Sequence, residues 1–147
     1  MKKLNLYLAA VVFMVMQSLT TLADDRIIPV EQLPVAAKSF IEKNFSNTDI
    51  AYATKDVDFV GATFEATLND GTEIDFDNTG NWIKVDCEYN AVPAAIVPAV
   101  IAQHVKANFS RAIITKIEKN RRGYEVELSN GLDLRFNKKG QFTGIDD

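Results

Sequence analysis

The chain has very little of the two residue types that build most metal centres and disulfide frameworks. Its 147 residues include one cysteine and one histidine. A structural zinc site needs about four Cys or His ligands, and a disulfide framework needs paired cysteines, so both are excluded. Hydrophobic residues make up 47% of the sequence and charged residues 24%. This composition is typical of a globular domain and excludes extensive disorder or a polytopic membrane protein.

Positive charge is also scarce. The sequence has 16 Lys and Arg against 20 Asp and Glu, which gives a formal net charge of −4 at pH 7. Nucleic-acid binding requires concentrated Lys and Arg to neutralise phosphates, so this balance argues against a nucleic-acid partner. The length suits one domain or two very small ones.

The first 23 residues predict a secretory signal peptide. Lys2 and Lys3 precede an apolar stretch at 4–16, and small residues at 21–23 suit a cleavage site. The apolar stretch is shorter than the ~20 residues of a membrane anchor. Cleavage removes both lysines, so the formal charge of the mature chain falls to −6. We expect a periplasmic or secreted protein, with residues 24–147 as its domain and no stable membrane insertion after cleavage.

The rest of the sequence contains one pattern twice. The segment 33–46 recurs as 97–110, at an offset of 64 residues, with Leu-Pro or Val-Pro at its start and Asn-Phe-Ser at its end. Further matches occur at an offset of 60: Asp70-Gly71 with Asn130-Gly131, Phe76 with Phe136, Gly80 with Gly140, Trp82 with Phe142, and Asp86 with Asp146. These matches predict an internal duplication, with repeat one at about 27–89 and repeat two at about 90–147.

Each repeat is expected to begin with a helix and continue as four short strands. Pro34 and Pro98 suit the first helical position, where a missing N–H has no partner to lose. Apolar residues then recur at helical spacing: Ala37, Phe40, Ile41 and Phe45, and Ile101, Val105 and Phe109, with His104 on the same stripe. The expected strands are 50–58, 61–68, 72–76 and 81–87, then 112–120, 123–128, 132–136 and 141–146. This order predicts an α+β fold, an antiparallel sheet with helices on one face.

The turns predict the register of the strands. Residues 69–71 and 129–131 are typical of three-residue hairpin loops that end in glycine. Residues 77–80 and 137–140 look like four-residue loops. With strict alternation, these loops place Ile74 opposite Ile83 and Leu134 opposite Thr143 on the buried face. The same alternation places Trp82 and Phe142 on the solvent face, and Cys87 on the buried face with Ile83 and Val85.

These motifs resemble the PepSY-like periplasmic proteins of unknown function, whose fold is similar to the β-lactamase inhibitor protein. The resemblance covers about residues 27–147 and rests on Leu33-Pro34, Phe40-Ile41, Asn44-Phe45, Asp70-Gly71 and Gly80-Asn81-Trp82. It implies one curved sheet whose open face binds a partner protein. PepSY domains in peptidase propeptides are thought to restrain peptidases, so the resemblance also implies a binding or inhibitory role. His104 departs from the pattern, since the first repeat has Phe40 at the matching position.

No catalytic set stands out in the sequence. His104 lies on the inner stripe of its helix and is expected to be a hydrogen-bonded or boundary residue rather than a general base. Cys87 lacks a His partner at strand distance and is expected to be a buried thiol, with an intermolecular disulfide as the alternative. No phosphate-binding Gly-rich loop or His-Glu-x-x-His pattern occurs. We therefore expect a protein that is not an enzyme and has no cofactor.

The open sheet face is the predicted partner-binding site. Alternation places on it two aromatic rings, which often anchor interfaces, among charged side chains that favour a basic partner. The candidate residues are Trp82, Phe142, Glu65, Glu73, Asp75, Lys84, Glu125 and Arg135. The expected partner is another envelope or secreted protein. The alternative is that each ring only covers neighbouring strand residues.

A second candidate is a calcium site in the first repeat. Asp75, Asp77, Asn78 and Asn81 place oxygen donors around a turn that contains glycine, which suits a hard cation. The spacing is not that of an EF-hand, and Asp and Asn also occur in turns for local reasons. The second repeat has lysines at 138–139 in this turn, which would repel a cation. This site predicts the alternative function, a calcium-responsive or small-ligand-sensing periplasmic protein.

Overall fold

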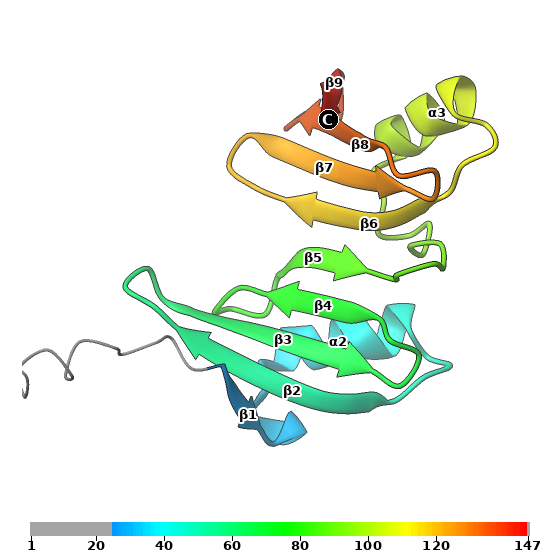
Figure 1. The fold of residues 1–147 in the computed structure, drawn as a ribbon. Coiled ribbons are helices and arrows are strands. Elements are labelled where there is room, and N and C mark those ends of the chain that lie inside the picture. The colour runs from blue at the N-terminus through cyan, green and yellow to red at the C-terminus, as the bar shows by residue number, and fades with distance from the viewer. Residues whose placement is uncertain (1–24, 147) are drawn as a thin grey trace, which may run out of the picture.

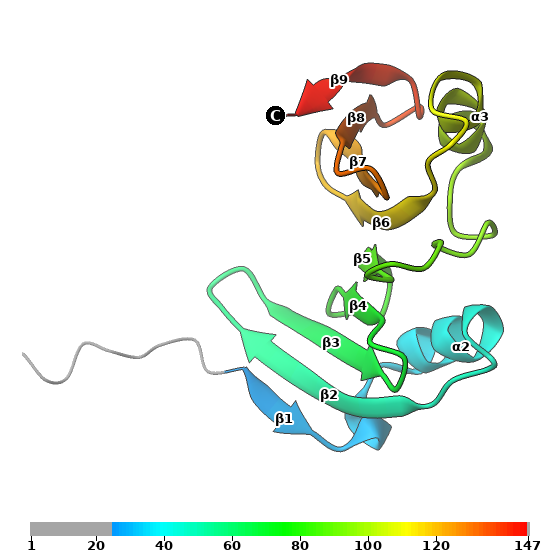
Figure 2. The same ribbon diagram turned by 45° about the vertical axis from the view of Figure 1, so that its right-hand side comes forward.

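The structure is a computed structural model and describes residues 25–146. Nine strands form one antiparallel sheet in which spatial order follows chain order (Figures 1 and 2). The strands are β1 (Arg26–Ile28), β2 (Ile50–Val57), β3 (Ala62–Leu68), β4 (Glu73–Phe76), β5 (Trp82–Asp86), β6 (Ile114–Lys119), β7 (Gly123–Leu128), β8 (Asp133–Asn137) and β9 (Phe142–Asp146). The eight expected strands are present, and β1 is an additional one. The predicted signal peptide lies outside the described residues.

Two α-helices pack on one face of the sheet. Helix α2 (Val35–Asn44) precedes β2, and α3 (Ala99–Asn108) precedes β6; a 3₁₀ helix, η1 (Val30–Gln32), follows β1. Among the described residues, no helix has the length and apolarity needed to cross a membrane. The mixed α/β class with an antiparallel sheet is therefore as predicted, and each helix is followed by four strands.

The prolines lie one position before the place the sequence predicts. Pro34 and Pro98 have ψ angles of 143° and 136°, which are extended rather than helical. Each is therefore the N-cap residue, and its carbonyl oxygen accepts the first helical hydrogen bond, from Lys38 N and Ala102 N respectively. The fixed φ of proline orients the chain as it enters each helix.

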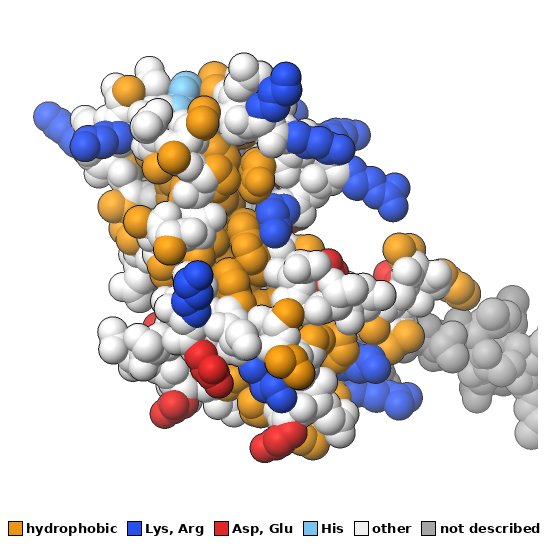
Figure 3. Space-filling model, turned by 180° about the vertical axis from the view of Figure 1, so that it is seen from behind, with side chains coloured by type: hydrophobic (Ala, Val, Ile, Leu, Met, Phe, Trp, Pro, Cys, Tyr) orange, Lys and Arg blue, Asp and Glu red, His pale blue; other side chains and the backbone are white. Residues whose placement is uncertain are grey.

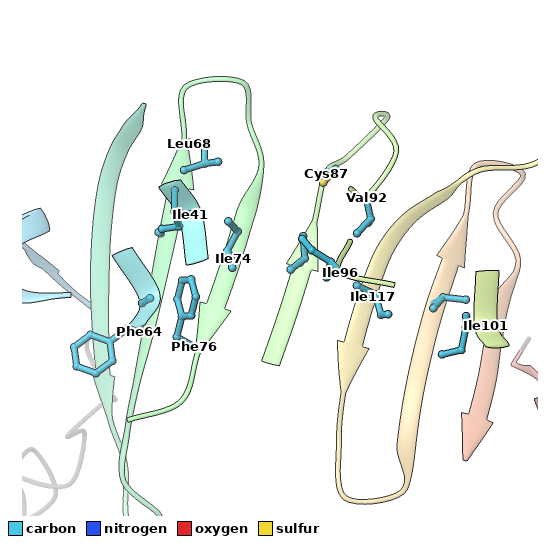
Figure 4. Close-up of a cluster of buried hydrophobic side chains, with 14 of the residues drawn as sticks. Ile41, Phe64, Leu68, Ile74, Phe76, Cys87, Val92, Ile96, Ile101 and Ile117 are labelled. Carbon is cyan, nitrogen blue, oxygen red and sulfur yellow. The ribbon is translucent and has the colours of Figure 1, made fainter. Parts of the chain in front are cut away.

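One apolar row crosses the sheet beneath the helices and forms a continuous core. Its fully buried members face each other strand by strand: Ala53, Ala66, Ile74, Val85, Ile117, Val126 and Leu134. Figure 4 shows Ile74 and Ile117 in this cluster together with Ile41 and Ile101, which the two helices contribute. Val85 pairs with Ile117 across β5 and β6. The two halves of the chain therefore share one core.

The two hairpin loops predicted at 69–71 and 129–131 are confirmed. Phe64 lies opposite Phe76 and Tyr124 opposite Phe136, as the register from these loops requires. The loop glycines Gly71 and Gly131 have φ angles of 89° and 83°, a conformation that other residues rarely adopt.

The register predicted for the next turn of each half is wrong because each carries a β-bulge. Asp75 pairs with Lys84 but Phe76 pairs with Trp82, so Ile83 is an extra residue. Ile74 consequently lies opposite Val85 rather than Ile83. An extra residue reverses the alternation of side chains, because two residues then oppose one. Trp82 therefore lies on the helix-covered face.

The second half repeats the bulge between β8 and β9. Arg135 pairs with Gly144 and Phe136 pairs with Phe142, which leaves Thr143 as the extra residue. Leu134 lies opposite Ile145 instead of Thr143. Phe142 accordingly shares the helix-covered face with Phe136.

Candidate functional site

Two rows of mostly charged side chains cross the face of the sheet that no helix covers, the face towards the viewer in Figure 1. The first row is Thr54, Glu65, Asp75, Lys84, Glu118, Glu125 and Arg135. The second row is Thr67, Glu73, Asp86, Lys116, Glu127, Asp133 and Asp146. Together these rows, here called the acidic face, hold nine Asp or Glu and three Lys or Arg. The resulting formal charge is −6.

Six of the eight residues predicted for the open face lie on the acidic face. They are Glu65, Glu73, Asp75, Lys84, Glu125 and Arg135. They belong to five different strands, β3, β4, β5, β7 and β8; alternation within each strand sets their face, and the pairing of the strands aligns them. The acidic face extends across both halves of the sheet.

In the first half, one lysine is surrounded by carboxylates. Lys84 Nζ lies 3.1 Å from Asp75 Oδ2. Burial lowers the pKa of Lys84, but Asp75 and the nearby glutamates outweigh burial and raise it. The pKa of Glu65 is raised, first by burial and then by the charges of Asp75 and Glu73. The single lysine therefore leaves an excess of negative charge.

The second half has the same excess. Arg135 lies 3.7 Å from Asp146, and Lys116 lies 4.0 Å from Glu127, both at partly exposed positions. The pKa of Glu125 is raised, first by burial and then by neighbouring carboxylates, of which Glu118 has the largest effect. In both halves, burial is the largest cause of the raised glutamate pKa, and the neighbouring carboxylates raise it further.

Trp82 does not lie on the open face, which corrects its assignment there. Its ring stacks on Phe40 of α2, with the ring centroids 6.2 Å apart. Lys119 Nζ also lies over the indole ring, 3.8 Å from its centroid. Burial lowers the pKa of Lys119, which is consistent with a lysine held against an aromatic ring. Trp82 thus joins the helix of the first half to β6 of the second.

Phe142 occupies the matching position in the second half and also leaves the open face. Its ring stacks on His104 of α3, with the centroids 4.5 Å apart and the planes at 15°. Phe136 makes edge contacts with both rings. Phe142 remains 40% exposed, but on the helix-covered side. His104 packs at the boundary of the core, as expected for a structural residue.

The turn predicted to bind calcium is closed by its own hydrogen bonds. Asp77 Oδ1 accepts bonds from the Thr79 N–H and hydroxyl and from the Asn81 N–H, at 2.7–2.9 Å. Asp77 Oδ2 accepts a bond from Asn81 Nδ2 at 3.2 Å. Burial raises the pKa of Asp77, but these donors outweigh it and hold the pKa below its usual range. The carboxylate therefore has its local partners without a cation.

The four predicted calcium ligands are also not gathered in one place. Asp75 points to the acidic face and pairs with Lys84, whereas Asp77 and Asn81 face each other within the turn, and Asn78 is exposed. Within residues 25–146, no group of three or more His, Cys, Asp or Glu side chains is arranged to hold a metal ion.

A hollow at the edge of the acidic face was not predicted. It has a volume of about 300 Å³ and is lined by Asp25, Thr54, Asp56, Thr63, Phe64, Glu65, Asp75 and Ile83. One carboxylate oxygen of Asp56 and one of Asp75 are buried there without a hydrogen-bond partner among the described residues. Alternation within β2 places Thr54 and Asp56 on one face, but the pairing of β2 with β3 was needed to bring them beside Glu65.

Cys87 is buried, as expected. Its side chain is 3% exposed, and burial raises its pKa to about 11. The thiol is therefore neutral at ordinary pH and is a poor nucleophile.

The fold and the acidic face together define a mixed α/β module built on one antiparallel sheet, one face of which is charged and is not covered by the helices of residues 25–146. A family model described as "putative beta-lactamase-inhibitor-like, PepSY-like" matches residues 62–144. The chain belongs to this PepSY-like family. No protein with a curated description matches it.

Solved structures of bacterial proteins are similar over nearly the whole described chain. A putative periplasmic protein of unknown function from Bacteroides vulgatus is 37% identical, with a TM-score of 0.81; the match covers 84% of this chain and 100% of that one. A putative calcium-regulated periplasmic protein from Bacteroides thetaiotaomicron is 40% identical, with a TM-score of 0.80, and the match covers 84% and 98%. A second putative periplasmic protein from Bacteroides vulgatus is 36% identical, with a TM-score of 0.81 and coverage of 86% and 99%.

Proposed function

We propose that this chain is an exported, non-enzymatic binding module that recognises a basic surface of another envelope or secreted protein. The observation that carries the proposal is the acidic face, with nine carboxylates and three basic groups on a sheet surface that no helix covers. Opposite charge on a partner would steer association and fix the orientation of the complex. The periplasmic descriptions of the similar structures and the signal-like residues 1–23 support export.

The proposal includes an internal duplication of one helix-plus-four-strand unit. The matched sequence positions support it, as does the recurrence of the same bulge directly after Trp82 and Phe142. A duplicated unit doubles the length of the bare sheet face without a second core. By family resemblance, the partner class we propose is a secreted peptidase or another envelope protein that the module restrains.

Neutralising two acidic-face glutamates is expected to weaken binding of a cationic probe. The probe is a fluorescein-labelled oligolysine peptide, and binding is measured by fluorescence anisotropy at low salt. Glu65→Gln/Glu125→Gln removes one charge from each half and should raise the Kd about tenfold, since each partly exposed charge contributes up to ~1 kcal/mol. As the pH falls, affinity should start to decrease above the ordinary glutamate pKa of 4.5, because both glutamates have raised pKa values and bind the peptide only when ionised.

A matched control separates the acidic face from overall charge. Glu31→Gln/Glu42→Gln makes the same charge change at exposed positions of η1 and α2. This variant should change the Kd less than twofold. Equal losses in the two variants would show that binding depends on net charge alone, and the acidic face would then not be the binding site.

The second candidate function is a calcium response, through the hollow rather than the turn. The unpartnered carboxylate oxygens of Asp56 and Asp75 favour it, because buried acceptors without donors are satisfied by a cation or water. The similar Bacteroides thetaiotaomicron protein is described as putatively calcium-regulated, which supports testing this ion.

Calcium is expected under this candidate function to raise the thermal midpoint. At calcium about tenfold above the Kd, linkage gives ~1.4 kcal/mol of stabilisation, or about 4 °C. Asp56→Asn should abolish the shift measured by differential scanning fluorimetry, whereas Asp133→Asn, elsewhere on the acidic face, should retain it. Magnesium serves as the ion control. A midpoint that millimolar calcium leaves unchanged in the parent protein would eliminate this candidate, and loss of the shift only in Asp77→Asn would move the site back to the turn.

A further inference from the structure

Four turns and the start of β1 lie at one end of the sheet, here called the hairpin end. Because each strand runs antiparallel to the next, alternate connections of the meander meet at the same end. The turns at the hairpin end are 58–61, 77–81, 120–122 and 138–141. In Figure 1 this is the end from which the grey N-terminal trace leaves, at the left. The acidic face looks out at right angles to this end.

Two of these turns have the same backbone hydrogen bonds, but one carries apolar side chains and the other carries basic ones. Asp58 Oδ1 accepts hydrogen bonds from the N–H groups of Val60 and Gly61, at 2.7 and 2.9 Å. Asn120 Oδ1 accepts the equivalent bonds from Arg122 and Gly123, at 2.8 and 3.1 Å. The closing glycines have φ angles of 147° and 148°. The same rigid turn therefore presents Phe-Val in the first half and Arg-Arg in the second.

The first of these turns forms an apolar tip, made of Val57, Phe59 and Val60. Phe59 is fully exposed, and Val60 and Val57 are 86% and 62% exposed. The hairpin projects beyond the body of the molecule in Figures 1 and 2. Single exposed apolar residues are ordinary, but three on one projecting, internally hydrogen-bonded turn mark a contact surface.

The second half supplies positive charge at the same end, here called the basic turns. They are Arg121, Arg122, Lys138 and Lys139, all exposed. None of the four forms an ion pair within residues 25–146. Neither basic turn contains Asp or Glu. Figure 3, which views the helix-covered side, shows Lys and Arg side chains projecting on the right of the upper half, above the apolar projection beside the grey trace.

We propose that the hairpin end docks on an anionic lipid surface. In this arrangement the apolar tip enters the interface between headgroups and acyl chains, and the basic turns lie on lipid phosphates. These long side chains are exposed and form no ion pair within residues 25–146, which suits a fluid layer of headgroups better than a shaped protein pocket with fixed partners. Each basic residue near an anionic membrane contributes on the order of a fivefold gain in affinity. Asp58 and Asp77, in the other two turns of this end, accept hydrogen bonds from amides of their own turns, and the four basic residues outnumber them.

Vesicle co-sedimentation tests the proposal with the mature chain. Vesicles of phosphatidylcholine alone are compared with vesicles that also contain phosphatidylglycerol. The chain should bind the phosphatidylglycerol vesicles, and binding should fall as salt rises. Arg121→Gln/Arg122→Gln should lower the affinity at least tenfold. Phe59→Ser/Val60→Ser should lower it at least fivefold and leave the salt dependence in place.

Further variants test whether a loss of vesicle binding results from unfolding or from a change in net charge rather than from damage to the docking surface. Lys43→Gln/Lys106→Gln removes two charges from the last turns of α2 and α3, at the opposite end of the sheet, and should bind as the parent does. Phe59→Arg/Val60→Arg copies the second turn onto the first, so the fold should survive, and salt dependence should become steeper. Urea unfolding confirms that each variant is folded.

Two results would overturn the proposal. One is the absence of binding to phosphatidylglycerol vesicles by the parent chain, which would leave a protein with an apolar pocket as the occupant. The other is an equal loss in the Lys43→Gln/Lys106→Gln variant, which would show that binding depends on net charge. Oligolysine binding at the acidic face should be unchanged in all the hairpin-end variants. A failure of the membrane-docking proposal can therefore be distinguished from a failure of the proposed function.

Discussion

Replacing Gly123 with alanine is expected to lower the free energy of unfolding by about 3 kcal/mol or more. Gly123 has a φ of 148° and opens β7, where it pairs with Asn137. A Cβ atom there would collide with the backbone carbonyl oxygen of Phe136 and the backbone of Asn137. Both partners belong to the β7–β8 ladder, so neither can move without breaking strand pairing. Urea unfolding would measure the loss, which corresponds to a thermal midpoint lower by roughly 10 °C.

Gly61 provides the matched control for this experiment. It closes the equivalent turn with a φ of 147°, but a Cβ atom at this position meets nothing within 4 Å. Gly61→Ala should therefore cost only the backbone strain, about 1 kcal/mol. The difference between the two variants isolates the close approach of backbones from the conformational preference of glycine. Similar losses in both variants would contradict the tight contact at Gly123.

Phe76→Ala is expected to have a comparable or larger effect, about 3–5 kcal/mol. Phe76 is fully buried, lies opposite Phe64, and makes an edge contact with Phe40 at 5.9 Å between centroids. Figure 4 shows its ring between β3 and β4 beneath α2. Removal would leave a cavity that the rigid sheet cannot close. Phe59→Ala makes the same chemical change at a fully exposed position and should alter stability by less than ~0.5 kcal/mol.

The Phe76 variant also tests whether the two halves unfold together. Val85 and Ile117 join them through one core, so a defect in the first half should lower the stability of both. The fluorescence of Trp82, the single tryptophan, and far-UV circular dichroism should then give the same midpoint. Separate transitions for the two signals would show that the halves are independent.

The strands and the three-residue loops could be predicted because short-range rules decide them. Period-two alternation fixes which residues face the core, and a loop that ends in Gly71 or Gly131 fixes the partner of each strand residue. The same rules placed Glu65 and Glu125 on the open face correctly. Strand β1 escaped prediction because three residues are too few to show a period.

The two bulges could not be predicted because contacts distant in sequence accompany them. Along β5, Trp82 and Lys84 are two residues apart and would share a face in a regular strand. The bulge instead places the indole ring against Phe40 of α2, where it buries apolar area. The turn before it also lies close to that helix, since a Cβ atom on Gly80 would lie 2.8 Å from Pro34 Cβ. Nothing within residues 72–87 signals that a helix lies there.

The hollow at the edge of the acidic face could not be predicted either, because contacts distant in sequence form it. The sequence supplies Asp56 and Asp75 far apart, and only the pairing of β2, β3 and β4 brings their oxygens to one hollow. The predicted calcium ligands, by contrast, were neighbours in sequence, and their turn uses Asp77 for its own amides. Proximity along the chain was therefore a poor guide to the placement of unpartnered carboxylates.

The strictly sequential order of the nine strands has a consequence for how the chain acquires its structure. All eight pairs of neighbouring strands in the sheet are also consecutive in the chain, so strand pairing joins segments that follow one another in the sequence. A chain that enters a compartment N-terminus first can therefore complete β1 to β5 while later residues are still arriving. Two pairings must close a long segment: β1–β2 encloses residues 29–49, which contain α2, and β5–β6 encloses residues 87–113, which contain α3. Folding should thus proceed from one end of the sheet to the other, and joining β6 to β5 is the step whose speed depends on forming α3.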